Sequence, residues 1–482
     1  MFAAVVPLRV DEAYYWTWSK ESVLSFLDHP PMVSWCVYFG TLMFGDTNFG
    51  VRFSGLLAML TMEVLLADIV WRMTRDWRWV AFAVLLPEAT IDYGLLMARV
   101  APDAALTVFA LAIAWALVRL TLSGNPRWWL LAGVFGGLAL LSKYIVVLLI
   151  PAIVAFALVP VRGKRPLAGR YPWLAVLIAI AIFSPVLYWN ATHDWASFRF
   201  QLNRPTQIQG WSLKFFGEFL GQQFLMLGPI VFPMVVISTA MVGWRGIRDR
   251  DPVAILLALC AAVPVGFLAG RSLYARIGDS WPLFVWPFAF ACIALNVARW
   301  RQRQPNSPVL RSVPYFAATA ILTGTGFVAL AVIYYTATDA NVLRNNDPIG
   351  KEAGFAQLAE AAHDELGKIG AKWFATTDYR TYAMLRWHLR DRIPVVQVDE
   401  RDRFIGFGAR EDAFAAPVGL YVTAQNPDAL WRTTSAVLEP VRQADLSWRG
   451  TRYDSYIMYR LTNWRPVLSP PPGDPFRTAV PH

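Results

Sequence analysis

Charged residues are scarce in this chain of 482 residues: Asp, Glu, Lys and Arg make up 16% of it, whereas hydrophobic residues make up 56%. A water-soluble domain usually carries about a quarter charged residues. The charge deficit coincides with long apolar runs. These runs exclude an ordinary soluble protein and indicate a chain that crosses a membrane several times.

Cysteine is rare as well. Cys36, Cys260 and Cys292 lie in apolar segments without paired or metal-ligand spacing, so they predict neither a disulfide framework nor a cysteine-based metal site. The formal net charge is +10. Its cations stand in loops between apolar segments, which points to membrane topology and to no nucleic-acid partner.

Hydropathy predicts an all-α polytopic membrane domain of about 10–11 transmembrane helices, each of about 20 residues. Residues 128–160 can be divided in more than one way, and the shortest span there requires either a thin membrane or an unwound join near Ser142 and Lys143. The predicted spans are 50–73, 79–98, 103–122, 128–142, 144–160, 173–189, 219–243, 253–270, 281–298 and 314–336.

Loop charge predicts the orientation of these spans. Alternate connections carry arginine and lysine clusters, near Arg75, Arg165, Arg248 and Arg301, and such loops should be cytoplasmic. The opposite, extracytoplasmic side then receives residues 11–50, 98–103, 142–144, 189–216, 271–280 and everything after about 337. We therefore expect a multi-pass protein of the inner (plasma) membrane whose chemistry faces away from the cytoplasm.

The two ends of the chain lead to predictions about the first helix and about the domain division. Residues 1–8 read as the end of a first helix, so the intact protein should have about eleven spans. Residues 1–336 should form the transmembrane domain, with outer loops at 10–49 and 190–216. Residues 337–482 should form a small extracytoplasmic α/β domain with a loose tail from Ser469. Its predicted helices are 351–369 and 379–388, and its predicted strands lie near 371–375, 394–398, 419–423 and 455–461.

Acidic residues mark the first outer segment. Asp11 and Glu12 precede Tyr14, Tyr15 and Trp16, which suits either a general base on an interfacial helix or an acidic helix start with an aromatic belt. Asp28 and His29 precede two prolines; the imidazole can bind a phosphate, or the stretch is a rigid loop before a helix.

Further charged residues lie near the same predicted surface. Asp103 either stabilises the N-terminus of a helix through the helix dipole or faces the first outer loop. Lys143 either snorkels or binds a lipid phosphate. Glu88 and Asp92 share a helix face within a span, where acids usually meet a cavity or a partner.

The predicted 190–216 loop carries cations on the side where they are disfavoured. Its His193, Arg199 and Arg204 call for an anionic partner, which the chain's own Asp194 can supply.

Several of these motifs occur together and in order: Asp11–Glu12, Asp28–Pro31, Phe49–Arg52, Pro102–Asp103 and Gly137–Tyr144. Over about residues 10–205 they resemble the polyprenyl-phosphate-sugar-dependent glycosyltransferases of the GT-C superfamily. That group includes the protein O-mannosyltransferases and the aminoarabinose transferase of lipid A.

The resemblance implies a donor, an acceptor and roles for residues. Asp11 matches the essential catalytic aspartate, Glu12 the second acid of that pair, and Arg204 a phosphate-contacting arginine. His29 stands where the lipid A enzyme has lysine. The implied reaction moves a sugar from a polyprenyl-phosphate carrier to a lipid, glycan or protein acceptor with inversion.

In that reaction Asp11 deprotonates the acceptor. Positive charge for the departing phosphate comes from Lys143, Arg204, Arg199 and His29. Supporting or substrate-binding roles fall to Asp28, Asp92, Asp103, Tyr144 and His193. No cofactor is required by the motifs, although Asp11, Asp103 and His29 can together hold a divalent metal ion.

Two other classes remain open. A transporter or lipid-sugar flippase would use Glu88 and Asp92 as coupling residues within the membrane. A catalytically inactive relative would act as an assembly partner.

Overall fold

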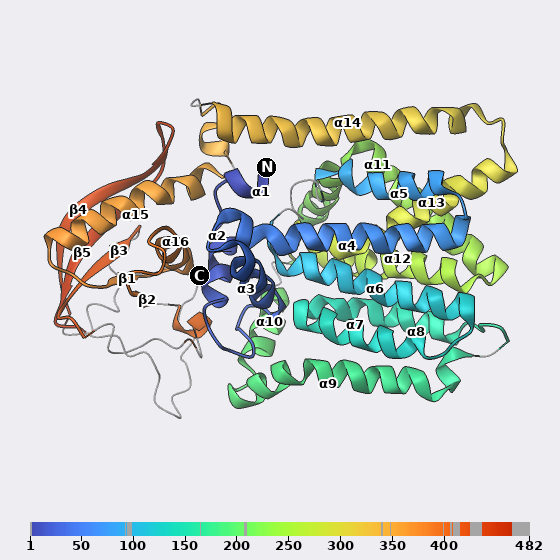
Figure 1. The fold of residues 1–482 in the computed structure, drawn as a ribbon, viewed down its shortest axis with the longest axis horizontal. Coiled ribbons are helices and arrows are strands. Elements are labelled where there is room, and N and C mark those ends of the chain that lie inside the picture. Colours follow the sequence, from blue (N-terminus) through green and yellow to red (C-terminus); the bar gives the residue numbers. More distant parts are fainter. Residues whose placement is uncertain are drawn as a thin grey trace.

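The computed structural model divides into a helical bundle and a smaller α/β unit, with α2 and α3 between them (Figure 1). It describes residues 2–464 apart from 92, 94–98, 164, 207–209, 339–340, 348, 399, 405–406, 408–414 and 425–435. The predicted loose tail from Ser469 lies outside the described residues. We call the end of the bundle that meets α2 and the α/β unit the site end.

In the described part of the chain, six helical segments are long and apolar enough to cross a membrane. They are α4 (Asn48–Thr74), α6 (Pro102–Ser123), α9 (Arg170–Thr192), α11 (Leu213–Asp249), α12 (Pro252–Ser272) and Leu283–Arg303, which joins the 3-10 turn η4 (Leu283–Val285) to α13 (Trp286–Arg303). The most buried are α6 and α13, which form the centre of the bundle. Each of the six lies on a predicted span, and the chain is a multi-pass membrane protein.

Further helices complete the bundle. They are α5 (Trp77–Glu88), α7 (Trp128–Ser142), the 3-10 helix η2 (Tyr144–Leu149), α8 (Ile150–Leu158), α10 (Ala196–Thr206) and α14 (Pro308–Ala337), with a 3-10 turn η3 (Pro166–Ala168). The predicted join at Lys143 is present: this residue is extended (φ −163°, ψ 135°) between α7 and η2. The break releases the Lys143 side chain from the helix surface at the site end.

The first predicted outer loop folds into helices. A single turn, α1 (Phe2–Val5), is followed by α2 (Val10–Trp18) and α3 (Met32–Phe44). From Glu12 to Trp18, every residue of α2 is buried, because the bundle covers one side and the α/β unit the other. In contrast, α3 leaves Trp35, Phe39 and Leu42 exposed, as an interfacial helix does at a membrane surface.

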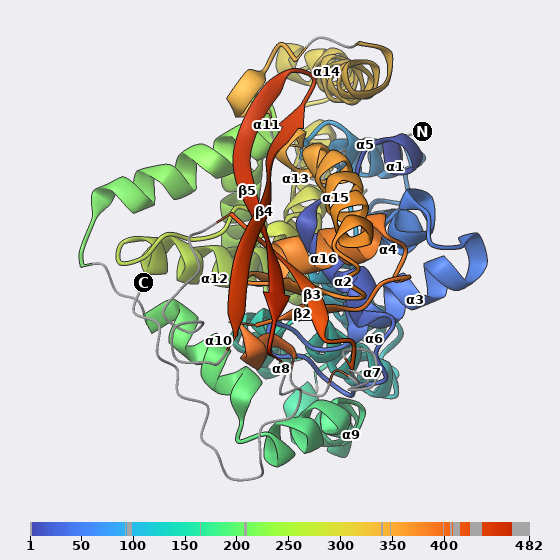
Figure 2. The ribbon, with the colours of Figure 1, turned by 90° about the vertical axis from the view of Figure 1, so that its left-hand side faces the viewer.

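The α/β unit contains α15 (Gly350–Lys368), β1 (Phe374–Thr376), α16 (Tyr379–His388), β2 (Val395–Gln397), β3 (Val418–Thr423), β4 (Val437–Trp448) and β5 (Thr451–Thr462), with 3-10 turns η5 (Arg344–Asn346) and η6 (Arg401–Phe404). The sheet order is β2-β1-β3-β5-β4; β1 is parallel to β2 and β3, and β5 is antiparallel to β3 and β4. Figure 2 shows the sheet facing the viewer.

The sequence did not predict β4. Only Leu446 of this edge strand is buried, and the strand contains Pro440, so it lacks the alternating apolar pattern of a half-buried strand. It forms because the tight turn at Arg449 and Gly450, both with positive φ, folds it back onto β5.

One hydrophobic core joins the α/β unit to α2 and α3. It includes Ala13, Trp16 and Val33 from the N-terminal helices and Leu358 and Tyr382 from the unit. The rings of Trp16 and Trp387 meet edge to face with centroids 5.2 Å apart. The unit is therefore packed onto the site end and is not tethered loosely by its linker.

Candidate active site

The two acids that open α2 have opposite environments. Successive helical residues point about 100° apart, so Asp11 is exposed while Glu12 is only 2% exposed. The Tyr379 hydroxyl, at the start of α16, donates to Asp11 Oδ1 at 3.4 Å. Asp11 therefore stands at the surface between α2 and the α/β unit, where a substrate can reach it.

Glu12 is committed to Arg52 of α4. Arg52 Nε donates to Glu12 Oε1 at 2.8 Å and Arg52 Nη2 donates to Oε2 at 2.6 Å, and both side chains are almost fully buried. The backbone N–H groups of Arg9 and Val100 also donate to this carboxylate, at 2.9 and 3.3 Å. With its oxygens occupied, Glu12 is placed to position α2, and it does not face the surface that Asp11 faces.

Electrostatics agree with that arrangement. Burial alone would raise the pKa of Glu12, but the charge and hydrogen bonds of Arg52 outweigh burial and lower it. Arg52 also donates to the carbonyl oxygens of Val6 and Pro7, at 2.7 and 2.8 Å. The pair thus ties the start of α2, and with it Asp11, to a membrane helix.

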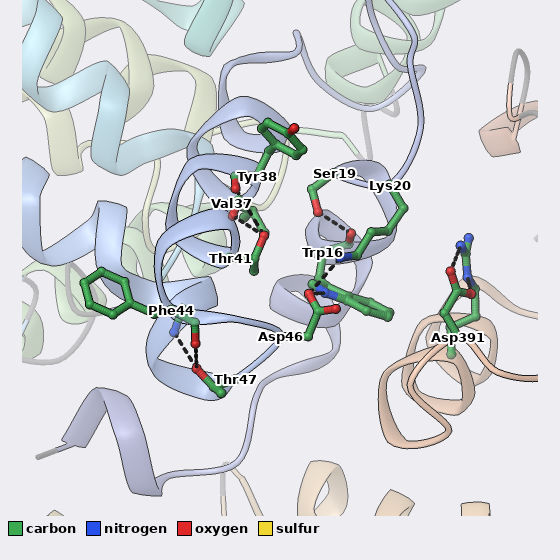
Figure 3. A network of polar contacts seen from close by, with 12 residues as sticks. Trp16, Ser19, Lys20, Val37, Tyr38, Thr41, Phe44, Asp46, Thr47 and Asp391 are labelled. Carbon is green, nitrogen blue, oxygen red and sulfur yellow. Dashed lines mark hydrogen bonds and ion pairs between the residues drawn. The ribbon is translucent and has the colours of Figure 1, made fainter.

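Figure 3 shows a second attachment of α2 on its opposite end. Asp46 lies in the loop between α3 and α4, and its Oδ1 accepts hydrogen bonds from Trp16 Nε1 and Lys20 Nζ, both at 2.7 Å. Because α2 is anchored at both ends, the position of Asp11 relative to the bundle is set by packing.

Tyr15 is the point on which three predicted acids converge. Burial, followed by the charges of Asp11, Asp28 and Asp103, raises the pKa of Tyr15 well above its ordinary value. The phenol is therefore neutral at physiological pH. Acids that lie in three separate segments of the sequence thus act electrostatically on one tyrosine.

Asp28 links the first segment to the α/β unit. Its Oδ1 accepts from Arg403 Nη1 at 2.6 Å, and its Oδ2 accepts from the Tyr14 hydroxyl at 3.2 Å. Arg403 also lies over the Tyr379 ring, 4.7 Å from the centroid. Since Tyr379 contacts Asp11, one arginine joins the Asp28 loop to the residue beside the proposed base.

Asp103 and Lys143 form an ion pair. Lys143 Nζ lies 2.8 and 2.9 Å from the two carboxylate oxygens of Asp103, which is in the first turn of α6. The Lys143 side chain is 13% exposed and that of Asp103 6%. The predicted phosphate-binding ammonium is thus held at the site end by a carboxylate that belongs to the same group around Tyr15.

The predicted 190–216 loop contains α10, which packs on this break. The Tyr144 hydroxyl lies 2.9 Å from Ser197 Oγ. His193 is stacked on Trp189, and its Nδ1 lies 2.7 Å from the Trp189 carbonyl oxygen, so it closes the end of α9. Arg199 is exposed. The side chain of Arg204 lies outside the described residues, as does Asp92.

His29 lies against Tyr15, with ring centroids 6.4 Å apart. Within the described ranges, no three His, Cys, Asp or Glu side chains are grouped closely enough to hold a metal ion. The carboxylates nearest to Asp11 contact arginine or lysine, so the expected Asp11, Asp103 and His29 metal site has no support in this geometry.

Four residues of this region had no role assigned from the sequence: Arg52, Tyr15, Tyr379 and Arg403. Arg52 follows Gly50 at the start of a membrane span, and an intramembrane arginine calls for a buried acid. Tyr379 and Arg403 carry no comparable pattern, because they are more than 360 residues from their partners.

These features define a class: a polytopic helical membrane protein with an acidic first segment at one end of the bundle and an α/β unit over it. Residues 28–189 match the family model of the dolichyl-phosphate-mannose-protein mannosyltransferases. The fold matches ArnT from Cupriavidus metallidurans, with a TM-score of 0.65 at 15% identity, covering 95% of this chain and 94% of that one. It also matches an oligosaccharyltransferase of Archaeoglobus fulgidus, with a TM-score of 0.52 at 13% identity, over 82% of this chain and 61% of that one.

Curated relatives lie in the same group. A lipid A galacturonosyltransferase of Rhizobium johnstonii is 28% identical over 58% of this chain and 61% of its own length. An undecaprenyl phosphate-α-4-amino-4-deoxy-L-arabinose arabinosyl transferase of Pseudomonas paraeruginosa is 25% identical over 65% of this chain and 56% of its own. The chain thus spans about three fifths of the length of these relatives. In sequence and in fold it is similar to glycosyltransferases of the GT-C superfamily.

Proposed function

We propose that this protein transfers a sugar from a polyprenyl-phosphate carrier to an envelope acceptor, with inversion at the anomeric carbon. The observation that carries the proposal is the division of labour in the acidic pair. Glu12 is buried against Arg52, whereas Asp11 is exposed beside Tyr379. The relatives are named as sugar transferases, and an ArnT structure contains bound undecaprenyl phosphate.

The reaction uses Asp11 as general base. Asp11 takes the proton of the acceptor hydroxyl while the acceptor oxygen forms a bond to the anomeric carbon. The bond from that carbon to the phosphate oxygen breaks, and the polyprenyl phosphate leaves with the electron pair. The reaction balances in atoms and electrons without a nucleotide or a redox partner.

The leaving phosphate needs positive charge. Lys143 is the best-placed candidate, because Asp103 holds its ammonium at the site end with both oxygens. Arg199 is exposed on α10 and can approach a lipid at the surface. His29 and Arg204 complete the proposed phosphate-binding group. The segments that carry these phosphate-binding residues are held in place by Asp28, Asp103, Tyr144 and His193. We propose a supporting role for Asp92 as well.

We also propose which side of the membrane the site faces and where the chain divides into domains. The site end faces away from the cytoplasm at the inner membrane, since the arginine-rich connections lie at the other ends of the helices. Residues 1–336 form the transferase domain and residues 337–482 the extracytoplasmic unit. The acceptor is lipid A or another envelope lipid, glycan or protein. The relatives' names describe two sugars of opposite charge, a uronic acid and an amino sugar.

The transporter alternative has less support. Glu88, one of its two coupling residues, interacts with Glu63 of the neighbouring helix α4. That contact joins neighbouring helices, as an intramembrane acid with a structural partner does. The named relatives are transferases, which favours transfer over transport.

Purified full-length protein in lipid nanodiscs tests the proposal. A labelled polyprenyl-phosphate sugar should release polyprenyl phosphate only when acceptor lipid is present. Asp11→Asn should lower this turnover by about 10²- to 10⁴-fold, the usual contribution of a general base. The matched control is Asp364→Asn, an exposed aspartate on α15, which should retain wild-type turnover. Unchanged turnover in Asp11→Asn would contradict the mechanism.

A further inference from the structure

One arginine at the end of a membrane helix has a buried nitrogen without a partner. Arg271 lies in the last turn of α12, and its Nη2 atom is buried and donates no hydrogen bond. Within the described part of the chain, its guanidinium forms no ion pair either. A buried N–H group without an acceptor is costly, and cations are disfavoured on the side that we propose to be extracytoplasmic. Arg271 therefore calls for an anion that the described residues do not supply.

The charged neighbours of Arg271 along the chain do not reach it. Arg276 pairs with Glu218 of α11, with its Nε atom 2.9 Å from Glu218 Oε2. Asp279 is exposed, and its Oδ1 accepts from the N–H group of Ser280 at 2.8 Å. The acid that is nearest along the chain is thus at the surface, whereas Nη2 of Arg271 is buried.

Packing places Arg271 near the break at Lys143. Leu268, one helical turn before Arg271, is buried in a cluster with Phe219 of α11, and Ile145 packs against this cluster. Ile145 belongs to η2, which begins directly after Lys143 and contacts α12. The two cations therefore border the same part of the site end, one at the break between α7 and η2 and the other at the end of α12.

The connection that follows Arg271 is attached to α11 and to the loop before it. The N–H group of Ser212 donates to the Leu273 carbonyl oxygen at 2.7 Å, and Gln223 Nε2 donates to the Asp279 carbonyl oxygen at 3.4 Å. Arg271 as a whole is partly exposed, so its guanidinium can turn toward a ligand. Since its backbone is already held, less entropy is lost on binding.

Lys143 by itself is poorly suited to stabilise a departing phosphate. Its ammonium lies 2.8 and 2.9 Å from the two oxygens of Asp103, so a phosphate that approaches Lys143 also approaches a carboxylate. The charge on the phosphate increases during the reaction, because the donor is a phosphodiester with a single negative charge and the product is a monoester with up to about two. A second cation without a carboxylate partner would offset this increase.

The surface beside Arg271 is open and apolar, as a lipid chain requires. Gly266 and Gly270 of α12 are exposed, and a Cβ atom on either would meet no other atom within 4 Å. Phe267, which lies between them in the sequence, and Phe224 of α11 are large apolar side chains that are also exposed. A polyprenyl chain can lie along this surface with its phosphate at the end of α12.

We propose that Arg271 binds the phosphate of the polyprenyl carrier together with Lys143. This inference rests on the proposed function and adds a residue to its phosphate-binding group. A guanidinium binds a phosphate through two parallel hydrogen bonds, which gives Nη2 the acceptor that it lacks. Because the phosphate gains charge as the sugar leaves, Arg271 stabilises the departing phosphate more than the intact donor and thereby accelerates transfer.

Binding of labelled polyprenyl phosphate to the detergent-purified full-length protein tests the inference. Polyprenol, which has the same chain without a phosphate, is the comparison ligand. Arg271→Gln should lower the affinity for polyprenyl phosphate by about 10- to 100-fold, as expected for hydrogen bonds between charged groups, and should leave the affinity for polyprenol unchanged. Arg271→Lys should recover part of the loss, because it restores the charge without the paired hydrogen bonds.

The matched control is Arg276→Gln, which removes a more exposed arginine of the same connection and should bind polyprenyl phosphate as the wild type does. Wild-type affinity in Arg271→Gln, or an equal loss of affinity for polyprenol, would overturn the inference and leave the proposed function intact. Full displacement of the labelled ligand by an equal concentration of phosphatidylglycerol would overturn the assignment to the carrier. If the wild type bound polyprenyl phosphate through Arg271 but transferred no sugar, the phosphate site would stand and the proposed function would fail.

Discussion

Replacing Glu12 with glutamine should destabilise this protein far more than removing a single hydrogen bond does. Both side chains of the Glu12–Arg52 pair are at most 2% exposed, and the guanidinium loses its counter-charge in the variant. Removing one partner of a buried ion pair costs about 3–5 kcal/mol. That loss corresponds to a factor of roughly 10² to 10^3.5 in the folded-to-unfolded ratio, since about 1.4 kcal/mol is tenfold.

The surrounding geometry explains why glutamine cannot substitute well. The carboxylate accepts from Arg52 on both oxygens and from two backbone N–H groups. An amide keeps only one oxygen and turns an NH₂ group toward those donors. The contacts of Arg52 with the Val6 and Pro7 carbonyl oxygens remain and moderate the loss.

The assay is thermal unfolding of the detergent-purified protein at one scan rate, because membrane proteins of this size often unfold irreversibly. Glu12→Gln should lower Tm clearly. Glu360→Gln, on the exposed face of α15, is the matched control and should change stability by less than about 0.5 kcal/mol. The double variant Glu12→Gln with Arg52→Met should recover part of the loss, because no unpaired charge stays buried.

One result would refute the positioning role. If Glu12→Gln had the Tm of the wild type but lost turnover as completely as Asp11→Asn, Glu12 would take part in the chemistry. The hypothesis drawn from the sequence, in which both acids of the pair are catalytic, would then be favoured over the one drawn from the geometry.

Two other predictions follow from the same contacts. The pKa of Glu12 is lowered in the folded state, so its ionised form stabilises the fold above the ordinary pKa of 4.5, and this stabilisation is lost as pH falls through the folded-state pKa. The Tm difference between wild type and Glu12→Gln should therefore narrow on acidification. A Tm difference that stays constant with pH would contradict the pairing of Glu12 with Arg52. Asp28→Asn should weaken the link to Arg403 and increase hydrogen exchange in residues 379–388, whereas exchange at the wild-type rate would show that the shared hydrophobic core alone holds the α/β unit in place.

The sequence alone was sufficient for the elements whose formation depends on local pattern. A bilayer requires helices of about 20 apolar residues, so the spans could be read from hydropathy. The shortness of one span within residues 128–160 left a break at Lys143 as one of two alternatives. Periodicity predicted α15, α16, β3 and β5 for the same reason. It failed at β4, whose exposed edge and Pro440 leave no local pattern, and whose existence depends on pairing with β5.

Tertiary structure decided which charged residues meet. The acid pair was visible in the sequence, but its division between an exposed Asp11 and a buried Glu12 depends on the packing of α2 against Arg52, 40 residues away. The contacts of Asp28 with Arg403 and of Asp11 with Tyr379 join residues 375 and 368 positions apart. An ion pair is selected by distance and burial in the folded chain, and neither is encoded in the order of residues along it. The sequence therefore identified Asp11 as a candidate base, and the fold determined the charges that surround it.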